Sequence, residues 1–225
     1  SVGTITNSGT ISASASSSAF GIKIESASSV GTLTNSGLIS ASAVSGAYGI
    51  DIHTSTVTTL NNSGTISVNA TATVGSSSSM TGIHVFSSSS VNNLTNSGLI
   101  SLSISGVVET SFQKAGAIRV SDASTVTTLT NSGTISLVSE ATHSTGVLSG
   151  INVQDTSSHI VTLNNLGIIS VTADNSANGI RVATGGIITT LTNSGSIDAY
   201  GSGASDIRND SGVITTFNNY QKSLT

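Results

Sequence analysis

Residues 126–136, VTTLTNSGTIS, are one of eight imperfect copies of a repeat that decides the fold. Aligned on their asparagine, the copies place in register Asn7, Asn35, Asn62, Asn96, Asn131, Asn165, Asn193 and Asn219, which lie 28, 27, 34, 35, 34, 28 and 26 residues apart. Self-similarity at such a period is typical of solenoids and propellers. We therefore predict one repeat domain over residues 1–225.

Each repeat holds three short segments whose patterns predict strands. The first is Val/Ile-x-x-Leu, the second follows NSG and alternates as Ile100, Leu102 and Ile104 do, and the third is Gly-Ile-x-Ile/Val. Alternation with period two indicates a strand with one buried face. Three strands per turn predict an all-β, right-handed parallel β-helix of about eight rungs, because parallel crossovers are overwhelmingly right-handed. Such a rod would be about 38 Å long. Leucine-rich repeats and propellers fit the pattern less well.

The NSG turn is expected to form a sharp corner of this coil. Asn tolerates the left-handed conformation and Gly supplies positive φ, which a corner between strands requires. Stacked at one corner, the eight asparagines would hydrogen-bond to one another as an internal ladder. Ligand binding by these asparagines is the weaker alternative, because a site needs only one or two of them.

Composition excludes several classes of protein. Only 7% of the 225 residues are charged, the net charge is -4, and there is no Pro, Cys or Trp. The chain therefore has no disulfide or thiolate metal site, and it lacks the basic stripe that nucleic-acid binding needs. No run of about 20 apolar residues predicts a transmembrane segment. The chain starts in mid-repeat at Ser1 without an initiator Met, so we expect a processed product or part of a longer repeat protein.

The tandem LTNSGTIS and GIxV segments, in a chain poor in charge and free of Cys, resemble the passenger region of bacterial autotransporters and related large surface adhesins. The resemblance covers residues 1 to about 219. It implies export to the surface of a Gram-negative bacterium as a right-handed β-helical stalk. Adhesive or self-associating roles follow from it, with partners that are other copies of the chain, side by side or end to end, or a surface glycan or protein.

All length variation between repeats falls in one corner. The Ile after NSG and the Ile of the next Gly-Ile segment lie 11 residues apart in three repeats, but 17, 18 and 16 apart at Ile66, Ile100 and Ile135. The insertions, at about 73–81, 106–115 and 140–149, would stack as a ridge, which in repeat folds is often the binding face. Its candidate ligand-binding residues are Glu109, Phe112, Gln113, Lys114, Glu140 and His143. Alternatively these loops cover the flank of the second strand.

A second candidate is the outward column of the third strand. Between the buried aliphatics lie Lys23, Asp51, His84, Arg119, Asn152, Arg181 and Arg208, followed two residues on by Glu25, His53, Phe86, Ser121, Gln154, Ala183 and Asp210. The favoured interpretation is solubility with cross-rung pairing, for example of Lys23 with Asp51 or of Arg208 with Asp210. The alternative is that Arg119, Asn152 and Arg181 bind a carboxylated sugar.

Enzymatic chemistry finds little support in the sequence. The ten acidic residues are scattered, whereas a glycosidase or lyase on a β-helix needs convergent carboxylates. The nearest approach to a catalytic or metal cluster is Asp51 with His53 and His84. We predict a non-enzymatic surface protein without catalytic residues, metal or cofactor. The alternatives are a carbohydrate-active enzyme of the pectate-lyase-like type and a structural subunit of an extracellular filament.

Overall fold

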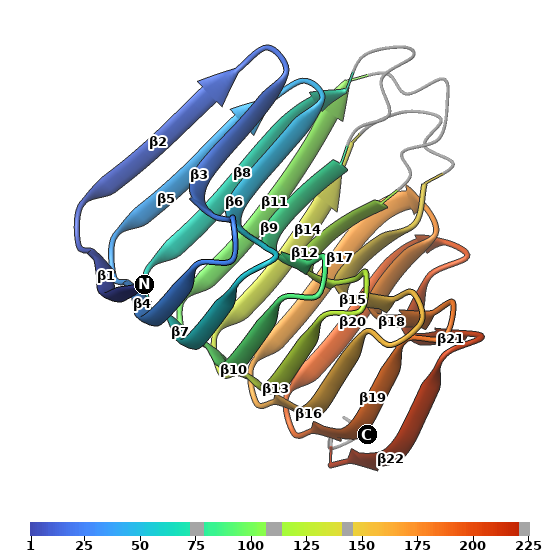
Figure 1. Ribbon diagram of the computed structural model, residues 1–225. Helices are drawn as coiled ribbons and strands as arrows, with labels where there is room; N and C mark the ends of the chain where they lie inside the picture. Colours follow the sequence, from blue (N-terminus) through green and yellow to red (C-terminus); the bar gives the residue numbers. More distant parts are fainter. Residues whose placement is uncertain (73–78, 107–113, 141–145, 221–225) are drawn as a thin grey trace.

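The protein is a right-handed parallel β-helix, as the repeat predicts (Figure 1). The computed structural model describes residues 1–72, 79–106, 114–140 and 146–220. In these ranges the chain forms strands and turns without a helix, and the strands stack into three parallel sheets along the rod.

Each sheet collects one of the three strands of every coil. Sheet A contains β1 (Val2–Asn7), β4 (Ser29–Asn35), β7 (Thr56–Asn62), β10 (Ser90–Asn96), β13 (Thr125–Asn131), β16 (His159–Asn165), β19 (Ile187–Asn193) and β22 (Val213–Asn219). Sheet B contains β2 (Thr10–Ala15), β5 (Leu38–Ala43), β8 (Thr65–Ala72), β11 (Leu99–Gly106), β14 (Thr134–Ser139), β17 (Ile168–Asn175) and β20 (Ser196–Ser202). Sheet C contains β3 (Ser18–Ile24), β6 (Gly46–His53), β9 (Ser79–Phe86), β12 (Lys114–Val120), β15 (Leu148–Gln154), β18 (Ala177–Ala183) and β21 (Ser205–Asp210).

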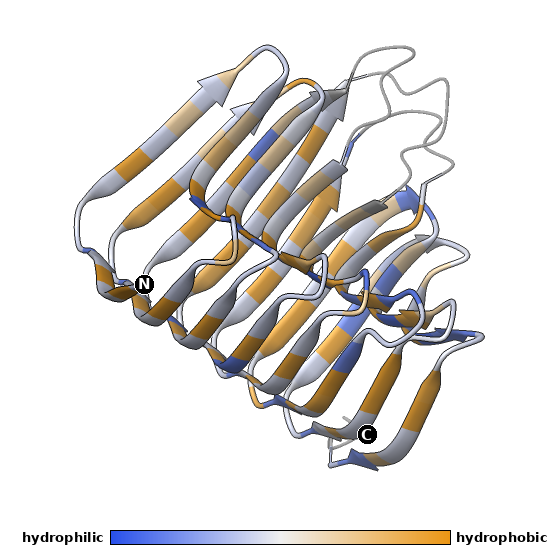
Figure 2. Ribbon diagram, in the orientation of Figure 1, coloured by the Kyte–Doolittle hydropathy of each residue, from blue (hydrophilic) through white to orange (hydrophobic). Residues whose placement is uncertain are grey.

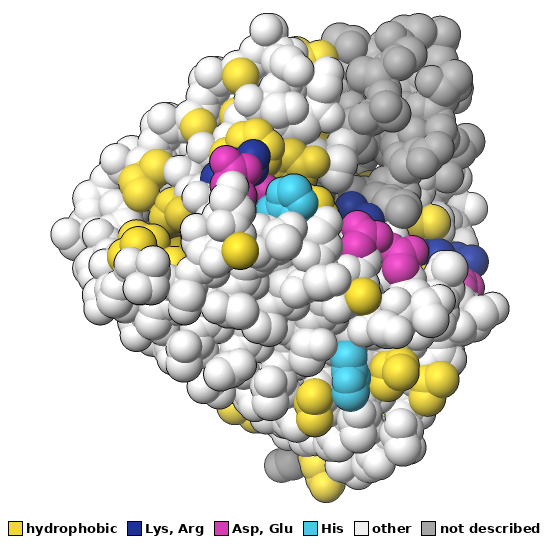
Figure 3. Space-filling view, viewed as in Figure 1, with side chains coloured by type: hydrophobic (Ala, Val, Ile, Leu, Met, Phe, Trp, Pro, Cys, Tyr) yellow, Lys and Arg dark blue, Asp and Glu magenta, His cyan; other side chains and the backbone are white. Residues whose placement is uncertain are grey.

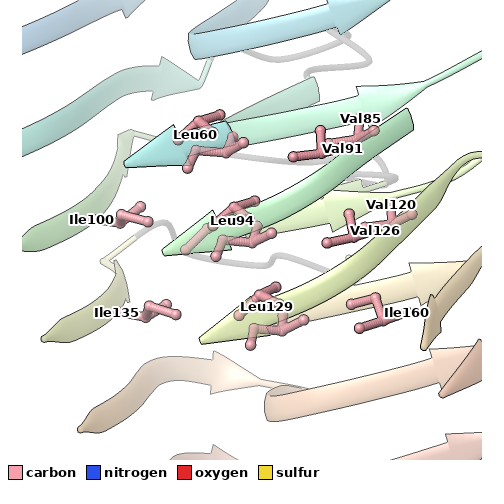
Figure 4. Packing of buried hydrophobic residues seen from close by; sticks show 14 of the residues in the cluster. Leu60, Val85, Val91, Leu94, Ile100, Val120, Val126, Leu129, Ile135 and Ile160 are labelled. Carbon is pink, nitrogen blue, oxygen red and sulfur yellow. The ribbon is translucent and has the colours of Figure 1, made fainter. Parts of the chain in front are cut away.

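Equivalent residues of successive repeats lie directly above one another. On sheet A, for example, Leu94 pairs with Leu60 on one side and with Leu129 on the other. Figure 4 shows the resulting stacks of Leu, Val and Ile between the sheets. The alternation of apolar and polar residues along each strand is visible in Figure 2. Like residues in register bury like surfaces, so the repeat itself sets the register of the sheets.

A second apolar cluster fills the wedge between sheets B and C. In the three coils that carry insertions this wedge holds large side chains, such as Met80, Leu102 and Leu148, whereas the first coils hold alanines at the equivalent positions. Met80 and Leu148 fall within the sequence ranges assigned to the insertions, yet both are fully buried strand residues.

The asparagine ladder is confirmed. From Asn7 to Asn219, each side-chain Nδ2 donates to the Oδ1 of the next asparagine over 2.7 to 3.0 Å. The expected left-handed conformation at the NSG turn is wrong, because none of its residues has positive φ. The glycine is needed for a different reason: a Cβ on Gly98 would lie 2.1 Å from the carbonyl oxygen of Gly64 in the preceding coil.

Most residues with positive φ lie instead at the corner between sheets C and A. They include pairs such as Ser87 and Ser88, with φ of 56° and 59°. A second ladder runs along this corner, in which a backbone N–H donates to a serine Oγ of the next coil: Ser28 to Ser55, Ser55 to Ser89, Ser89 to Ser124, and Ala123 to Ser158. The sequence interpretation missed this ladder. Its signal is a serine two residues before the first aliphatic residue of the Val/Ile-x-x-Leu segments that begin at Val30, Val57, Val91, Val126 and Ile160.

Candidate functional site

The outer face of sheet C brings together most of the ring and charged side chains that the sequence placed in its outward column. A bend at one small residue in each of β3, β6, β9, β12, β15 and β18 shapes this face, whereas β21 has Asp206 at the equivalent position. A Cβ on Gly82 would lie 2.5 Å from the carbonyl oxygen of Ala117 and 2.6 Å from Cγ2 of Ile100, and Ala117 takes the same position in β12. After the bend the alternation restarts, so that each strand presents two further side chains outward.

Five stacked rings cover the part of this face formed by β3, β6 and β9. Phe20 stacks on Tyr48 with ring centroids 4.9 Å apart, and Tyr48 lies 5.8 Å from His84. Phe86 then stacks on both histidines, 4.2 Å from His84 and 4.4 Å from His53. Four of the five residues are half-buried, so their rings remain partly open to solvent: Phe20, Tyr48, His53 and Phe86. The ammonium of Lys23 lies 5.0 Å above the Phe20 ring, within the range of a cation–π contact.

The polar residues of the column are buried, which corrects the interpretation of the column as a solubilising surface. The exposed fraction is 2% for Asp51, 5% for His84, 6% for Arg119 and 1% for Asn152. Arg181 is half-buried. A charge on the surface costs little, whereas a buried charge needs polar partners. The column is therefore a buried polar network with an exposed edge.

Asp51, His84 and Ser121 form a hydrogen-bonded chain across three coils. Nδ1 of His84 lies 3.1 Å from Oδ1 of Asp51, and its Nε2 lies 3.4 Å from Oγ of Ser121. Burial lowers the pKa of His84, and the hydrogen bond that its ring donates to Asp51 only partly offsets this, so the imidazole is neutral near pH 7. This is the order of contacts in a serine nucleophile relay. Ser121, however, has no exposed surface through which a substrate would reach it.

Arg119 lies one strand further along the column, and burial lowers its pKa. No salt bridge joins Arg119 to an acid among the residues that the structure describes. Five buried side-chain atoms of the described chain have no hydrogen-bond partner, and all belong to the outer face of β9, β12, β15 and β18: Thr81 Oγ1, Arg119 Nε, Ser149 Oγ, Asn152 Oδ1 and Asn178 Oδ1. Leaving a buried polar atom unpaired costs about 1–3 kcal/mol, so these atoms mark the least satisfied part of the molecule.

The two ends of the column are ion-paired. Asp210 accepts from Nε of Arg181 and from Nε of Arg208, each over 2.9 Å. Burial alone would raise the pKa of Asp210, but the two guanidinium groups outweigh it and hold that pKa below its usual value. The expected pairing of Arg208 with Asp210 is therefore confirmed. Lys23, in contrast, pairs with Glu25 and not with Asp51.

Part of the candidate insertion ridge can be located. Glu109, Phe112, Gln113 and His143 lie outside the described residues. Lys114 begins β12, so it belongs to a strand and not to a loop. Glu140 is exposed directly after β14, where its backbone N–H donates to the carbonyl oxygen of Ile104 over 2.9 Å. The ridge stays a prediction.

Other possible sites on the described chain are weaker. The nearest approach to a metal cluster in the sequence is split, because Asp51 contacts His84 while His53 stacks on Phe86. Among residues 1–72, 79–106, 114–140 and 146–220, no group of three or more His, Asp or Glu side chains could hold a metal ion. A shallow hollow of about 170 Å³ at the corner between sheets C and A is lined by Ala27, Ser28, Thr54, Ser55, Thr56 and Ser88, and offers only hydroxyl groups.

The fold and this face define the chain as a β-helical repeat protein with one chemically distinct side. Comparison with protein-family models, with curated proteins and with solved structures gives no significant match. In the part of the chain that the structure describes, nothing is helical and apolar over a length sufficient to cross a membrane.

Proposed function

We propose that the chain is a non-enzymatic, adhesive β-helical stalk on the surface of a Gram-negative bacterium, and that it binds a glycan through the outer face of sheet C. The contrast between the three outer faces is the observation that carries this proposal. The outer positions of sheet A are mostly Thr and Asn, and those of sheet B are mostly Ser and Thr. Sheet C holds the five-ring stack with the adjoining Lys23, Glu25 and Arg119. Figure 3 shows the charged side chains visible from this side gathered in one band.

Half-buried aromatic rings beside charged groups suit sugars. The apolar face of a pyranose packs on a ring, and its hydroxyl groups hydrogen-bond to neighbouring polar side chains. Phe20 and Tyr48 present such rings, and Lys23 and Glu25 lie beside them at the surface. Tyrosine is also among the side chains most enriched in binding hot spots.

The hydrolase alternative rests on Asp51, His84 and Ser121. Their contacts have the order of a nucleophile relay, but Ser121 is fully buried and the distance from Nε2 to Oγ is long at 3.4 Å. A network of this kind also serves simply to satisfy a buried aspartate and histidine. The enclosed hydroxyl group favours the non-enzymatic function.

A glycan array probed with the purified chain tests the proposal, followed by titration of the bound glycans against variants. Tyr48→Ala removes the ring between Phe20 and His84, and we expect about fivefold weaker binding, because a stacked ring contributes about 1 kcal/mol. Lys23→Met removes the cation over Phe20 from a side chain that is 36% exposed, so folding is not at risk. Tyr200→Ala on sheet B is the matched control, since Tyr200 is 58% exposed and outside the stack. The proposal is overturned if the chain binds no glycan, or if Tyr200→Ala weakens binding as much as Tyr48→Ala.

A further inference from the structure

The outer face of sheet A carries a regular two-dimensional array of sixteen side chains, twelve threonines and four asparagines. Its first file runs through Thr4, Thr32, Thr59, Asn93, Thr128, Thr162, Thr190 and Thr216. Its second file, two residues further along each strand, runs through Thr6, Thr34, Asn61, Thr95, Thr130, Asn164, Thr192 and Asn218. Neighbours within a file are paired strand to strand without a break, and Figure 1 shows these strands stacked along the whole rod. We call these two files the threonine array.

The spacing of the array follows from the geometry of the sheet. Adjacent strands lie about 4.8 Å apart, and residues two apart along a strand lie about 6.7 Å apart. The sixteen side chains therefore form a nearly rectangular grid. All of them are half-buried or exposed. None of the threonine hydroxyl groups takes part in a hydrogen bond with another described residue, so each is available to solvent.

Strand propensity alone does not account for the threonines. The equivalent outward file of sheet B carries serine in six successive strands: Ser12, Ser40, Ser67, Ser101, Ser136 and Ser170. Both faces belong to parallel sheets of the same rod, yet these equivalent files hold mainly threonine on sheet A and serine on sheet B. In the outward file of sheet B two residues earlier, threonine occupies only alternate strands, at Thr10, Thr65 and Thr134. Branching at Cβ restricts χ1, so stacked threonines hold their hydroxyl and methyl groups in one repeated orientation. The array is thus a rigid, patterned surface.

The chemistry of the array argues against a protein or a glycan as its partner. The cores of protein interfaces are enriched in aromatic residues, Met and Arg, and glycan sites use ring platforms. The array contains neither, and the eight strands of sheet A have no Asp, Glu, Lys or Arg. A flat grid of small amphipathic groups without charge offers no hot spot. It offers many weak hydrogen bonds to a partner that repeats with the same period.

We propose that the threonine array binds ice. The exposed planes of hexagonal ice also repeat as rectangles with two unequal spacings, and each is similar in length to the corresponding spacing of the threonine array. Water held by the hydroxyl groups, and ordered around the methyl groups, would join such a lattice at many points at once. Ordered water costs at most about 2 kcal/mol of entropy per molecule, and a rigid grid that orders a whole layer at once makes adsorption collective. The inference is independent of glycan binding, since it concerns another face of the rod.

Partition of the purified chain into slowly growing polycrystalline ice, together with the shaping of single ice crystals, tests this inference. The chain is expected to enrich in the ice and to shape its faces. Thr128→Lys on β13 places a long side chain in the middle of the threonine array, so that the neighbouring residues of both files can no longer approach a flat ice surface. We expect its partition into ice to fall about tenfold, equivalent to about 1.4 kcal/mol. Ser136→Lys on β14 makes the same substitution on the outer face of sheet B, in the same coil, and should partition as the parent does.

Circular dichroism confirms that both variants are folded before they are compared. The inference is overturned if the parent chain stays in the liquid like an ordinary globular protein, or if Ser136→Lys lowers partition as much as Thr128→Lys. A third outcome also rejects it: if Thr128→Lys abolishes a concentration-dependent dimer in sedimentation while ice shaping is absent, the array is an interface between copies of the chain.

Discussion

Asn96→Ala offers the sharpest test of what holds the coil together. Asn96 is fully buried, accepts a hydrogen bond from Nδ2 of Asn62 over 2.7 Å and donates to Oδ1 of Asn131 over 2.8 Å. The substitution removes both bonds, each with a net contribution of about 1 kcal/mol, and leaves Oδ1 of Asn131 buried without a donor, which costs about 1–3 kcal/mol. We therefore expect the free energy of unfolding to fall by about 3–5 kcal/mol.

Urea denaturation followed by circular dichroism measures this loss, with the midpoint and slope compared between variants. Asn93→Ala is the matched control, because Asn93 lies on the same strand but is exposed on its outer side. We expect the control to change the free energy of unfolding by no more than about 0.5 kcal/mol. If the two variants lose similar stability, the ladder is a consequence of the stacking and not one of its causes.

Two further predictions concern the NSG corner and the buried histidine. Gly98→Ala should lower the free energy of unfolding by about 1–3 kcal/mol, because its Cβ would lie 2.1 Å from the backbone oxygen of Gly64, which cannot move alone. Gly9→Ala is the control, since open space surrounds Gly9, and it should lower the free energy of unfolding less in the same melting experiment. Burial lowers the pKa of His84 below 6.5, so His84 binds a proton more readily in the unfolded chain than in the folded one. The stability due to the neutral imidazole is therefore complete above about pH 6.5 and is lost as the pH falls below that value. The melting temperature should therefore fall between about pH 7 and about pH 5.5, and His84→Gln should flatten that slope; an unchanged slope would contradict the role assigned to His84.

The sequence predicted which residues lie together on the outer face of sheet C, but not how deeply they are buried or what they contact. Taking the residue directly after each Gly-Ile, or after Ala-Ile in β12, placed Asp51, His84, Arg119 and Asn152 in one column, and the structure pairs them in that order. Their burial was not predictable, because it depends on what lies over the outer face and not on the strand pattern. The contact of His84 with Ser121 joins residues 37 positions apart, among many serines that give no local signal.

The sequence by itself determined the architecture, since a repeated pattern of aliphatic residues and one asparagine per coil has only one register in which every like residue stacks on its like. The ladder from Asn7 to Asn219 follows from that register alone. Only the tertiary structure decided why the NSG glycines are glycines, because the atom that excludes a Cβ belongs to the neighbouring coil. It also decided which outward residues are buried and which face presents the uncharged threonine array. Burial and contacts depend on the side chains that pack around a residue, whereas a repeat pattern specifies only which residues stack on one another.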